Sequence, residues 1–289
     1  MKNPEAPVPL TTLSCLKIHG SDARSFLQSQ LTIDIRKLEP GQSRLGAYCE
    51  PTGRVISTFI LALIDEIFYM LVPASLEETI KSTLLRYRIR AKVKFDSPTE
   101  AAVHGCYLNE ENSTACSSIQ QVEFAHPLDL QRKFILQPAA NTEDTDNRRT
   151  TKAWALADIN SGMVWLDQHT TTSHLPQSLG LVANNAVDFD KGCYPGQEII
   201  ARLKYLGKSK YTLRRFEAEI ESLKATTVAD LRDSSGKRQG QCLNSISHGQ
   251  KSTGLVVVSK AAISAGKELY FIDENSMVLG KIVEFNNFF

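Results

Sequence analysis

Residues 191–198 read Lys-Gly-Cys-Tyr-Pro-Gly-Gln-Glu, and this short stretch constrains the backbone more than any other part of the chain. Proline presets the backbone angle at the second position of a turn, and glycine accepts the positive φ that a type II turn needs at the third. The stretch therefore predicts a type II turn over 194–197, with Cys193 on the rim of a rigid loop and Lys191 close enough to favour its thiolate. A second interpretation stays open, because free cysteines are often small buried core residues.

The composition excludes several classes of protein. The 289 residues carry 33 Lys and Arg against 32 Asp and Glu, a net charge of +1, so no global field points to nucleic acid or membrane. The six cysteines include no C-x-x-C pair, which predicts that the chain does not hold a metal or a complete iron–sulfur cluster by itself. The first ten residues lack the apolar core of a signal peptide, so we expect a soluble cytoplasmic protein with reduced thiols.

Apolar periodicity predicts a mixed α+β region in the first two thirds of the chain. Buried strands are expected at 55–64 and 67–72, followed by a helix that begins near Ser75. Residues 86–95 alternate between cationic and apolar side chains, the pattern of a strand with one charged face. The remaining predictions for this region are strands at 101–108, 119–125 and 133–137, a polar loop at 139–150, and a helix at about 151–160 that ends at Gly162.

The composition changes beyond residue 205. Short apolar runs alternate there with Gly, Ser, Asp and Asn, which predicts a small all-β barrel. We therefore expect two domains, an α+β region at 1–205 and a barrel at 206–289. The predicted barrel strands are 214–220, 254–259, 268–272 and 278–285.

Two stretches are rich in Lys and Arg, the alternating segment at 86–95 and residues 202–215, which also contain Tyr205 and Tyr211. They suit a groove for phosphates or an acidic partner, with tyrosines available for stacking; the alternative is a solvated strand face and an interdomain linker. Trp154 likewise has two interpretations, a core residue or a stacking face for a flat heteroaromatic ligand.

The loop at 191–198, extended through Arg202, resembles the signature of the YgfZ family of folate-binding proteins. That family is related to the T-protein (aminomethyltransferase) of the glycine cleavage system. Further similar segments follow the same order along the chain: Gly20 to Gln28, Gly53-Arg54-Val55 and Leu175-Pro176-Gln177. The resemblance implies an N-terminal folate-binding region of ferredoxin-like α+β units, followed by a C-terminal barrel.

The resemblance also implies site residues. Cys193 corresponds to the key cysteine of the family, with Lys191 beside it, and Trp154 to a tryptophan that takes part in folate binding. Asn160 stands where T-proteins carry a glutamate that contacts the pterin ring, so the position keeps hydrogen-bonding capacity without the charge. The other folate-contacting residues expected from the signature are Tyr194, Gln197 and Arg202.

The leading hypothesis is an accessory factor, not a stand-alone enzyme, for assembly or repair of [4Fe–4S] proteins, including radical enzymes that thiomethylate tRNA. It would bind tetrahydrofolate or a related folate, and Cys193 would present one thiolate to a cluster shared with iron–sulfur assembly proteins or client enzymes. Two rivals remain: a tetrahydrofolate-dependent one-carbon transferase, and a tRNA-binding module that uses cations such as Arg88, Arg90, Lys208 and Lys210.

Overall fold

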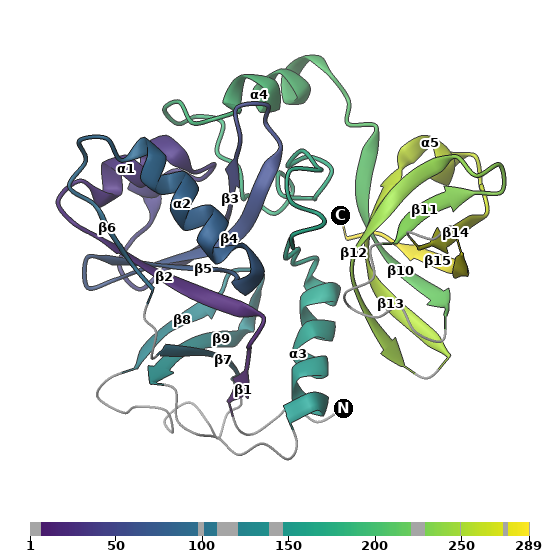
Figure 1. Cartoon of the computed structure of the whole chain (residues 1–289), viewed down its shortest axis with the longest axis horizontal. Coiled ribbons are helices and arrows are strands. Elements are labelled where there is room, and N and C mark those ends of the chain that lie inside the picture. The colour runs from purple at the N-terminus through teal and green to yellow at the C-terminus, as the bar shows by residue number, and fades with distance from the viewer. Residues whose placement is uncertain are drawn as a thin grey trace.

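The computed structural model describes residues 7–97, 101–108, 121–138, 147–220, 229–248, 250–273 and 277–288. Two antiparallel sheets form the first part of the chain and a closed barrel forms the last, with helix α3 (Asn147–Ser161) standing between them (Figure 1). The fold class predicted from the sequence is confirmed.

The first sheet is five-stranded, in the order β3-β4-β5-β2-β6. Without the edge strand β3, its order and its two helices follow the βαββαβ arrangement of ferredoxin-like units. Strand β4 is buried along nearly its whole length, as its apolar sequence predicts. The elements are β2 (Leu13–His19), α1 (Ala23–Gln30), η1 (Ile35–Lys37), β3 (Ser43–Cys49), β4 (Val55–Ile64), β5 (Ile67–Pro73), η2 (Ala74–Leu76), α2 (Glu77–Tyr87) and β6 (Lys94–Asp96).

The strand predicted over 86–95 is wrong. Helix α2 continues to Tyr87 and ends in turns, in which the amide of Ala91 donates to the carbonyl of Arg88. A strand forms only at the end of this stretch, where Lys94–Asp96 pairs with β2. The alternation fails as a signal because its apolar residues do not share a buried face: Ile89 is 88% exposed, while Val93 is buried.

The second sheet has the order β1-β7-β9-β8, and α3 follows it in the chain. The helix begins at Asn147, earlier than predicted, and ends before Gly162, whose φ of 70° suits a helix C-terminus. Residues 119–120 and 139–146, on which parts of two predictions fall, lie outside the described residues. The strands are β1 (Val8–Pro9), β7 (Ala101–Tyr107), β8 (Val122–His126) and β9 (Asp129–Pro138).

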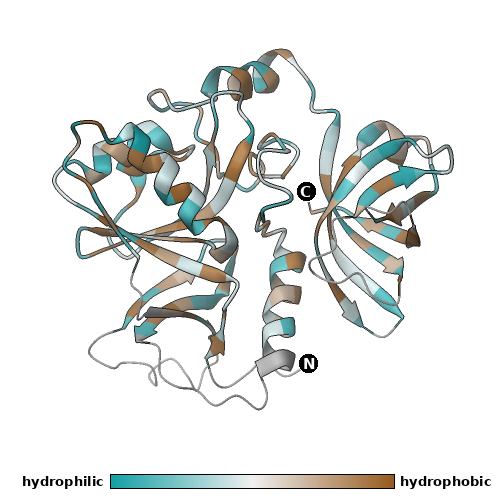
Figure 2. Cartoon of the chain, viewed as in Figure 1, coloured by the Kyte–Doolittle hydropathy of each residue, from teal (hydrophilic) through white to brown (hydrophobic). Residues whose placement is uncertain are grey.

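An irregular segment leads from Gly162 to helix α4 (Gln197–Leu206), and the barrel begins at Tyr211. The six strands close in the order β10-β13-β12-β11-β14-β15. Hydrophobic and hydrophilic residues alternate along them (Figure 2), as strands with one face in a core require. The elements are β10 (Tyr211–Glu219), β11 (Asp230–Asp233), β12 (Arg238–His248), β13 (Lys251–Ser259), α5 (Lys260–Ser264), β14 (Leu269–Ile272) and β15 (Val278–Asn286). The division of the chain at 205/206 stays a prediction.

The barrel has its own core and also packs against the rest of the chain. Its interior is a separate apolar cluster that includes Phe216 and Phe271. On its outer wall, Leu213, Leu243 and Val257 belong instead to the large cluster that contains the two sheets and α3. These apolar contacts hold the barrel beside α3. Val257 and Leu243 also line the two cavities that lie between the barrel and the rest of the chain.

Candidate functional site

The predicted type II turn is present at residues 194–197. The amide of Gln197 donates to the carbonyl of Tyr194 at 3.2 Å, and Gly196 has φ 81° and ψ −2°. Gly196 also packs against the β3–β4 turn, where a Cβ atom on it would lie 2.5 Å from the Cα of Gly53 and 2.6 Å from the carbonyl oxygen of Glu50. The turn therefore needs glycine for its conformation and for its contact.

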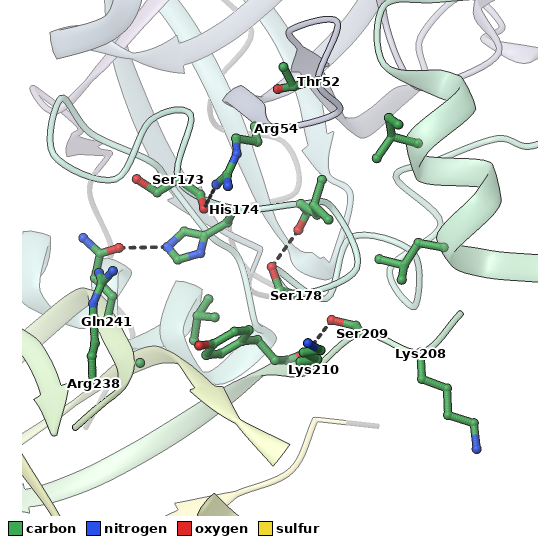
Figure 3. Close-up of a pocket in the computed structure, with 16 residues that line it drawn as sticks. Thr52, Arg54, Ser173, His174, Ser178, Lys208, Ser209, Lys210, Arg238 and Gln241 are labelled. Carbon is green, nitrogen blue, oxygen red and sulfur yellow. Dashed lines mark hydrogen bonds between the residues drawn. The ribbon is translucent and has the colours of Figure 1, made fainter. Parts of the chain in front are cut away.

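A cationic cleft of about 550 Å³ lies beside this turn, between α4, the 173–178 segment and the barrel (Figure 3). The Arg54 guanidinium donates to the carbonyl of Ser173 at 2.6 Å, and the His174 ring is 3.0 Å from the side-chain oxygen of Gln241 on the barrel. Burial, together with the charges of Arg238 and Arg54, lowers the pKa of His174 to about 4, so the ring is neutral at pH 7. The cations that line the cleft are Arg54, Lys208, Lys210 and Arg238.

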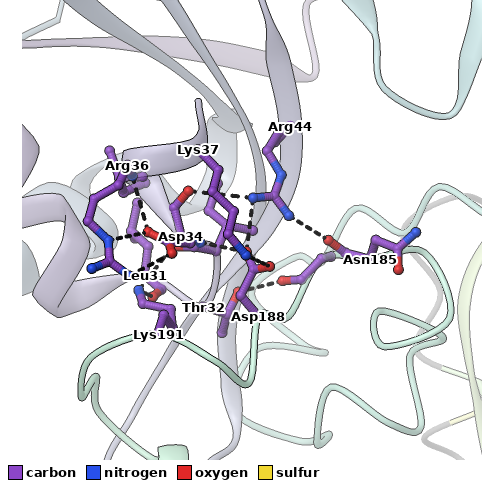
Figure 4. Close-up of polar contacts among 12 residues, drawn as sticks. Leu31, Thr32, Asp34, Arg36, Lys37, Arg44, Asn185, Asp188 and Lys191 are labelled. Atoms are coloured by element: carbon purple, nitrogen blue, oxygen red, sulfur yellow. Dashed lines mark hydrogen bonds and ion pairs between the residues drawn. The ribbon is translucent and has the colours of Figure 1, made fainter. Parts of the chain in front are cut away.

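Lys191 fastens the cysteine loop to the first sheet region (Figure 4). Its ammonium donates to the carbonyls of Gln28, Leu31 and Ile33 at 2.7, 2.5 and 2.9 Å. An ammonium has three donors, and these carbonyls use all of them. Burial lowers the pKa of Lys191 to about 8, although Asp34 raises it in part. Lys191 thus holds the loop that carries Cys193, and its ammonium faces these carbonyls; its predicted effect on the thiol stays a prediction.

Further polar contacts tie the segment before the loop to the same region (Figure 4). The Asp188 carboxylate accepts from the amide of Asp34 at 2.6 Å and pairs with Arg44 at 2.9 Å. The Thr32 hydroxyl donates to the carbonyl of Ala186 at 2.7 Å. The segment that leads to Cys193 is therefore anchored at Ala186, Asp188 and Lys191.

Cys193 itself is exposed, whereas Cys15, Cys49, Cys106 and Cys242 are buried. Burial raises the pKa of the Cys242 thiol to about 12, so that cysteine stays protonated at pH 7. Of the two interpretations open at the sequence level, the structure supports the accessible thiol.

Two other residues of the signature support the loop from within. Tyr194 is 6% exposed, and its hydroxyl is buried without a hydrogen-bond partner in the described part of the chain. Gln197 donates from its side chain to the carbonyl of Lys191 at 3.4 Å. Neither lines the cleft or the cavity described next, so their predicted contact with a folate finds no support in the geometry.

Trp154 lies at a second cavity, of about 510 Å³, formed by α3, the 165–169 segment and the barrel strand β12. Most of its indole is core: the residue is 2% exposed, and its ring meets Tyr107 and Phe134 edge to face with centroids 5.5 Å apart. Its indole N–H is nevertheless buried without a partner among the described residues. Trp165 lines the same cavity and is only partly buried, so this cavity presents two indoles.

A buried carboxylate, Asp158, lies one helical turn after Trp154 and also lines the cavity. It pairs with Arg132 at 2.7 Å and accepts from the indole N–H of Trp165 at 3.0 Å. His126 faces it at 3.3 Å through Nε2, and because the amide of Leu128 donates to Nδ1, the ring proton is on Nε2. Burial pushes the pKa of Asp158 upward, but His126 and Arg132 outweigh it, and the pKa lies below its usual value.

The other predicted folate-contacting residues lie elsewhere. Asn160 is exposed, and its side-chain oxygen accepts from Arg215 of the barrel at 2.8 Å. Arg202 is exposed on α4. Sequence reasoning missed Asp158 and Arg132, although the spacing of Asp158 from Trp154 on one helix face was visible. Arg132 comes from strand β9 and not from this helix, so its role had no sequence signal.

Among the residues that the structure describes, no group of three or more His, Cys, Asp and Glu side chains is placed to hold a metal ion. No described helix is both long and apolar enough to cross a membrane.

Comparisons with known proteins identify the family. The GCVT N-terminal domain family matches residues 8–105. The tRNA-modifying protein YgfZ of Buchnera aphidicola is 30% identical, with 73% of this chain and 74% of the relative aligned, and that of Vibrio vulnificus is 29% identical over 88% and 85%. The glycine cleavage system aminomethyltransferase T of Bartonella henselae superposes with a TM-score of 0.66 over 96% of this chain and 84% of that protein, at 14% identity, a likeness of fold. The chain belongs to the YgfZ family.

Proposed function

We propose that this protein is a cytoplasmic, folate-binding accessory factor for the assembly or repair of [4Fe–4S] proteins, including enzymes that thiomethylate tRNA. The observation that carries the proposal is the exposed thiol of Cys193 on a turn held by Lys191 and by the Gly196–Gly53 contact. The names of its relatives, tRNA-modifying proteins, agree with a role in tRNA modification.

The cavity beside Trp154 has features that suit the ring system of a folate. Its volume of about 510 Å³ falls within the usual range for small-molecule sites. The indole N–H of Trp154, which has no partner in the described part of the chain, is a donor for a ring heteroatom, and the ionised Asp158 is an acceptor for ring N–H groups. Trp165 adds a partly exposed aromatic surface for stacking. A bound folate would supply one-carbon chemistry, while these residues would bind and orient it.

Cys193 would act on a cluster carried by a partner. A [4Fe–4S] cluster is held by four thiolates, and one exposed cysteine supplies one of them. The partner must therefore bring the remaining ligands, and Cys193 would bind the cluster only while the cluster is transferred between proteins.

The one-carbon transferase remains a rival that rests on the shared fold. The residue aligned with the glutamate of T-proteins, Asn160, hydrogen-bonds Arg215 and does not line the cavity. Steady-state turnover of tetrahydrofolate with an aminomethyl donor would favour the transferase over the accessory factor.

Titration with tetrahydrofolate, followed by tryptophan fluorescence, tests the ligand. We expect saturable quenching in the wild type and in Trp154→Phe, where Trp165 is the remaining reporter, and at least tenfold weaker binding in Asp158→Asn. Unchanged affinity in both Asp158→Asn and Trp165→Phe would remove this cavity as the folate site.

Complementation tests the thiol separately. In cells that lack the protein, Cys193→Ala should fail to restore the activity of a tRNA-thiomethylating enzyme, whereas Cys242→Ala, which alters a buried thiol, should restore it. The purified Cys193→Ala protein should still bind tetrahydrofolate. Full restoration by Cys193→Ala would refute the thiolate role.

A further inference from the structure

The cationic cleft beside the turn at 194–197 (the cysteine turn) is explained neither by the folate cavity at Trp154 nor by the thiol of Cys193. We propose that it binds the phosphodiester backbone of a single-stranded RNA segment. The residues of the cleft do not line the Trp154 cavity and do not include Cys193, so RNA binding here is independent of the proposed folate and cluster roles.

The charged side chains that line the cleft are all cationic. Among the described residues, its lining holds four cations and no carboxylate, in a chain whose net charge is only +1. Among the described ion pairs, Arg238 is partnered by Asp230 at 2.8 Å, whereas Arg54, Lys208 and Lys210 take part in none. Three cations thus keep charge available for a ligand, which predicts an anionic occupant.

The neutral groups of the cleft suit phosphate oxygens. The hydroxyls of Thr52, Ser178 and Ser209 line it beside the cations, and hydroxyl, lysine and arginine side chains are the usual partners of phosphates and sugars. His174 is neutral at pH 7, so its ring adds no positive charge to the cleft.

Shape and aromatic character favour a nucleic-acid strand over a free anion. The cleft measures about 550 Å³, far more than one phosphate fills. Tyr211, 41% exposed, lines it next to Lys210, and Ile199, Leu203 and Val257 supply an apolar wall. A basic groove with an exposed aromatic ring is the arrangement that binds single strands by backbone contacts and base stacking.

The cleft also lies where a bound strand would meet the thiol region. Thr52 and Arg54 belong to the β3–β4 turn that contacts Gly196, and Ile199 follows the cysteine turn directly on α4. RNA in the cleft would therefore run close to the loop that carries Cys193.

Fluorescence anisotropy with a fluorescein-labelled 12-nucleotide RNA of mixed sequence tests the proposal. For single strands the logarithm of affinity falls with the logarithm of salt by about 0.7 per neutralised phosphate, so three cations give a slope near −2. Lys208→Gln/Lys210→Gln should reduce the slope by about 1.4, which makes binding about 25-fold weaker at 0.1 M salt if the two curves meet at 1 M. Tyr211→Ala should weaken binding at every salt concentration without changing the slope.

The matched control is Lys92→Gln/Lys94→Gln, which removes the same charge from exposed lysines at strand β6. That strand is one edge of the five-stranded sheet, and the β3–β4 turn is at the other. The control should bind RNA like the wild type, and the Lys208/Lys210 variant should bind tetrahydrofolate like the wild type.

Three outcomes would overturn the proposal: equal losses in the two lysine pairs, no binding of the RNA at 0.1 M salt, or preferential binding of poly-γ-glutamate or an acidic peptide. The last would assign the cleft to a polycarboxylate instead. Asp158→Asn, by contrast, should lose folate binding and should bind RNA like the wild type.

Discussion

Replacing Gly196 by alanine tests the idea that the cysteine turn is held by a close approach of two backbones. Gly196 and Gly236 have nearly the same φ, 81° and 80°, but their surroundings differ. A Cβ on Gly196 would lie 2.5 Å from the Cα of Gly53 and 2.6 Å from a carbonyl oxygen, whereas nothing lies within 4 Å of a Cβ on Gly236. The two alanine variants therefore separate the cost of backbone conformation from the cost of contact.

The expected magnitudes follow from these distances. Alanine in the left-handed region costs roughly 1–2 kcal/mol, of which about 0.4–1 kcal/mol is recovered because the unfolded chain loses freedom. Gly236→Ala should thus lower the free energy of unfolding by about 1 kcal/mol. At Gly196 the overlap involves backbone atoms that cannot rotate away, which adds roughly 1–3 kcal/mol, for a total of about 2–4 kcal/mol.

Urea unfolding followed by circular dichroism measures the free energies, and the rate of Cys193 alkylation by iodoacetamide reports on the loop. Gly196→Ala should change the alkylation rate, and Gly236→Ala should leave it at the wild-type value. Equal destabilisation by the two substitutions would refute the argument that contact with Gly53 fixes the turn.

Three further predictions concern buried or half-buried polar groups, each measured by urea unfolding. Lys191→Met leaves three carbonyl acceptors without their donor and should lower the free energy of unfolding by about 2–4 kcal/mol; a loss below about 0.5 kcal/mol would show that the ammonium does not hold the loop. Asp158→Asn leaves the fully buried Arg132 without one of its two carboxylate partners and should cost about 3 kcal/mol, part of which Asp158→Leu/Arg132→Met should restore. His174 has a folded pKa of about 4 against an ordinary 6.5, so the unfolded chain takes up the proton first as pH falls between these values. Stability should drop by about 2 kcal/mol more between pH 7.5 and 5 in the wild type than in His174→Gln, and identical pH profiles would contradict the half-buried, neutral ring.

The sequence predicted local features well wherever neighbouring residues decide the conformation. The Pro195-Gly196 pair predicted the turn, and the long apolar run of β4 predicted a buried strand, because each depends on backbone preference or burial within one segment. The alternation at 86–95 misled because periodicity records side-chain type and not whether a partner strand is present.

By itself, the sequence determined the family signature, the fold class and the cysteine on a constrained turn. Only the tertiary structure decided what its charged residues do. Lys191 faces three carbonyls from a segment more than 150 positions earlier, and Asp158 on helix α3 pairs with Arg132 of strand β9. The same holds for the cationic cleft, whose lining comes from a sheet turn, a helix and the barrel. These contacts join segments far apart in the chain, so their charges, burial and partners have no local sequence signal.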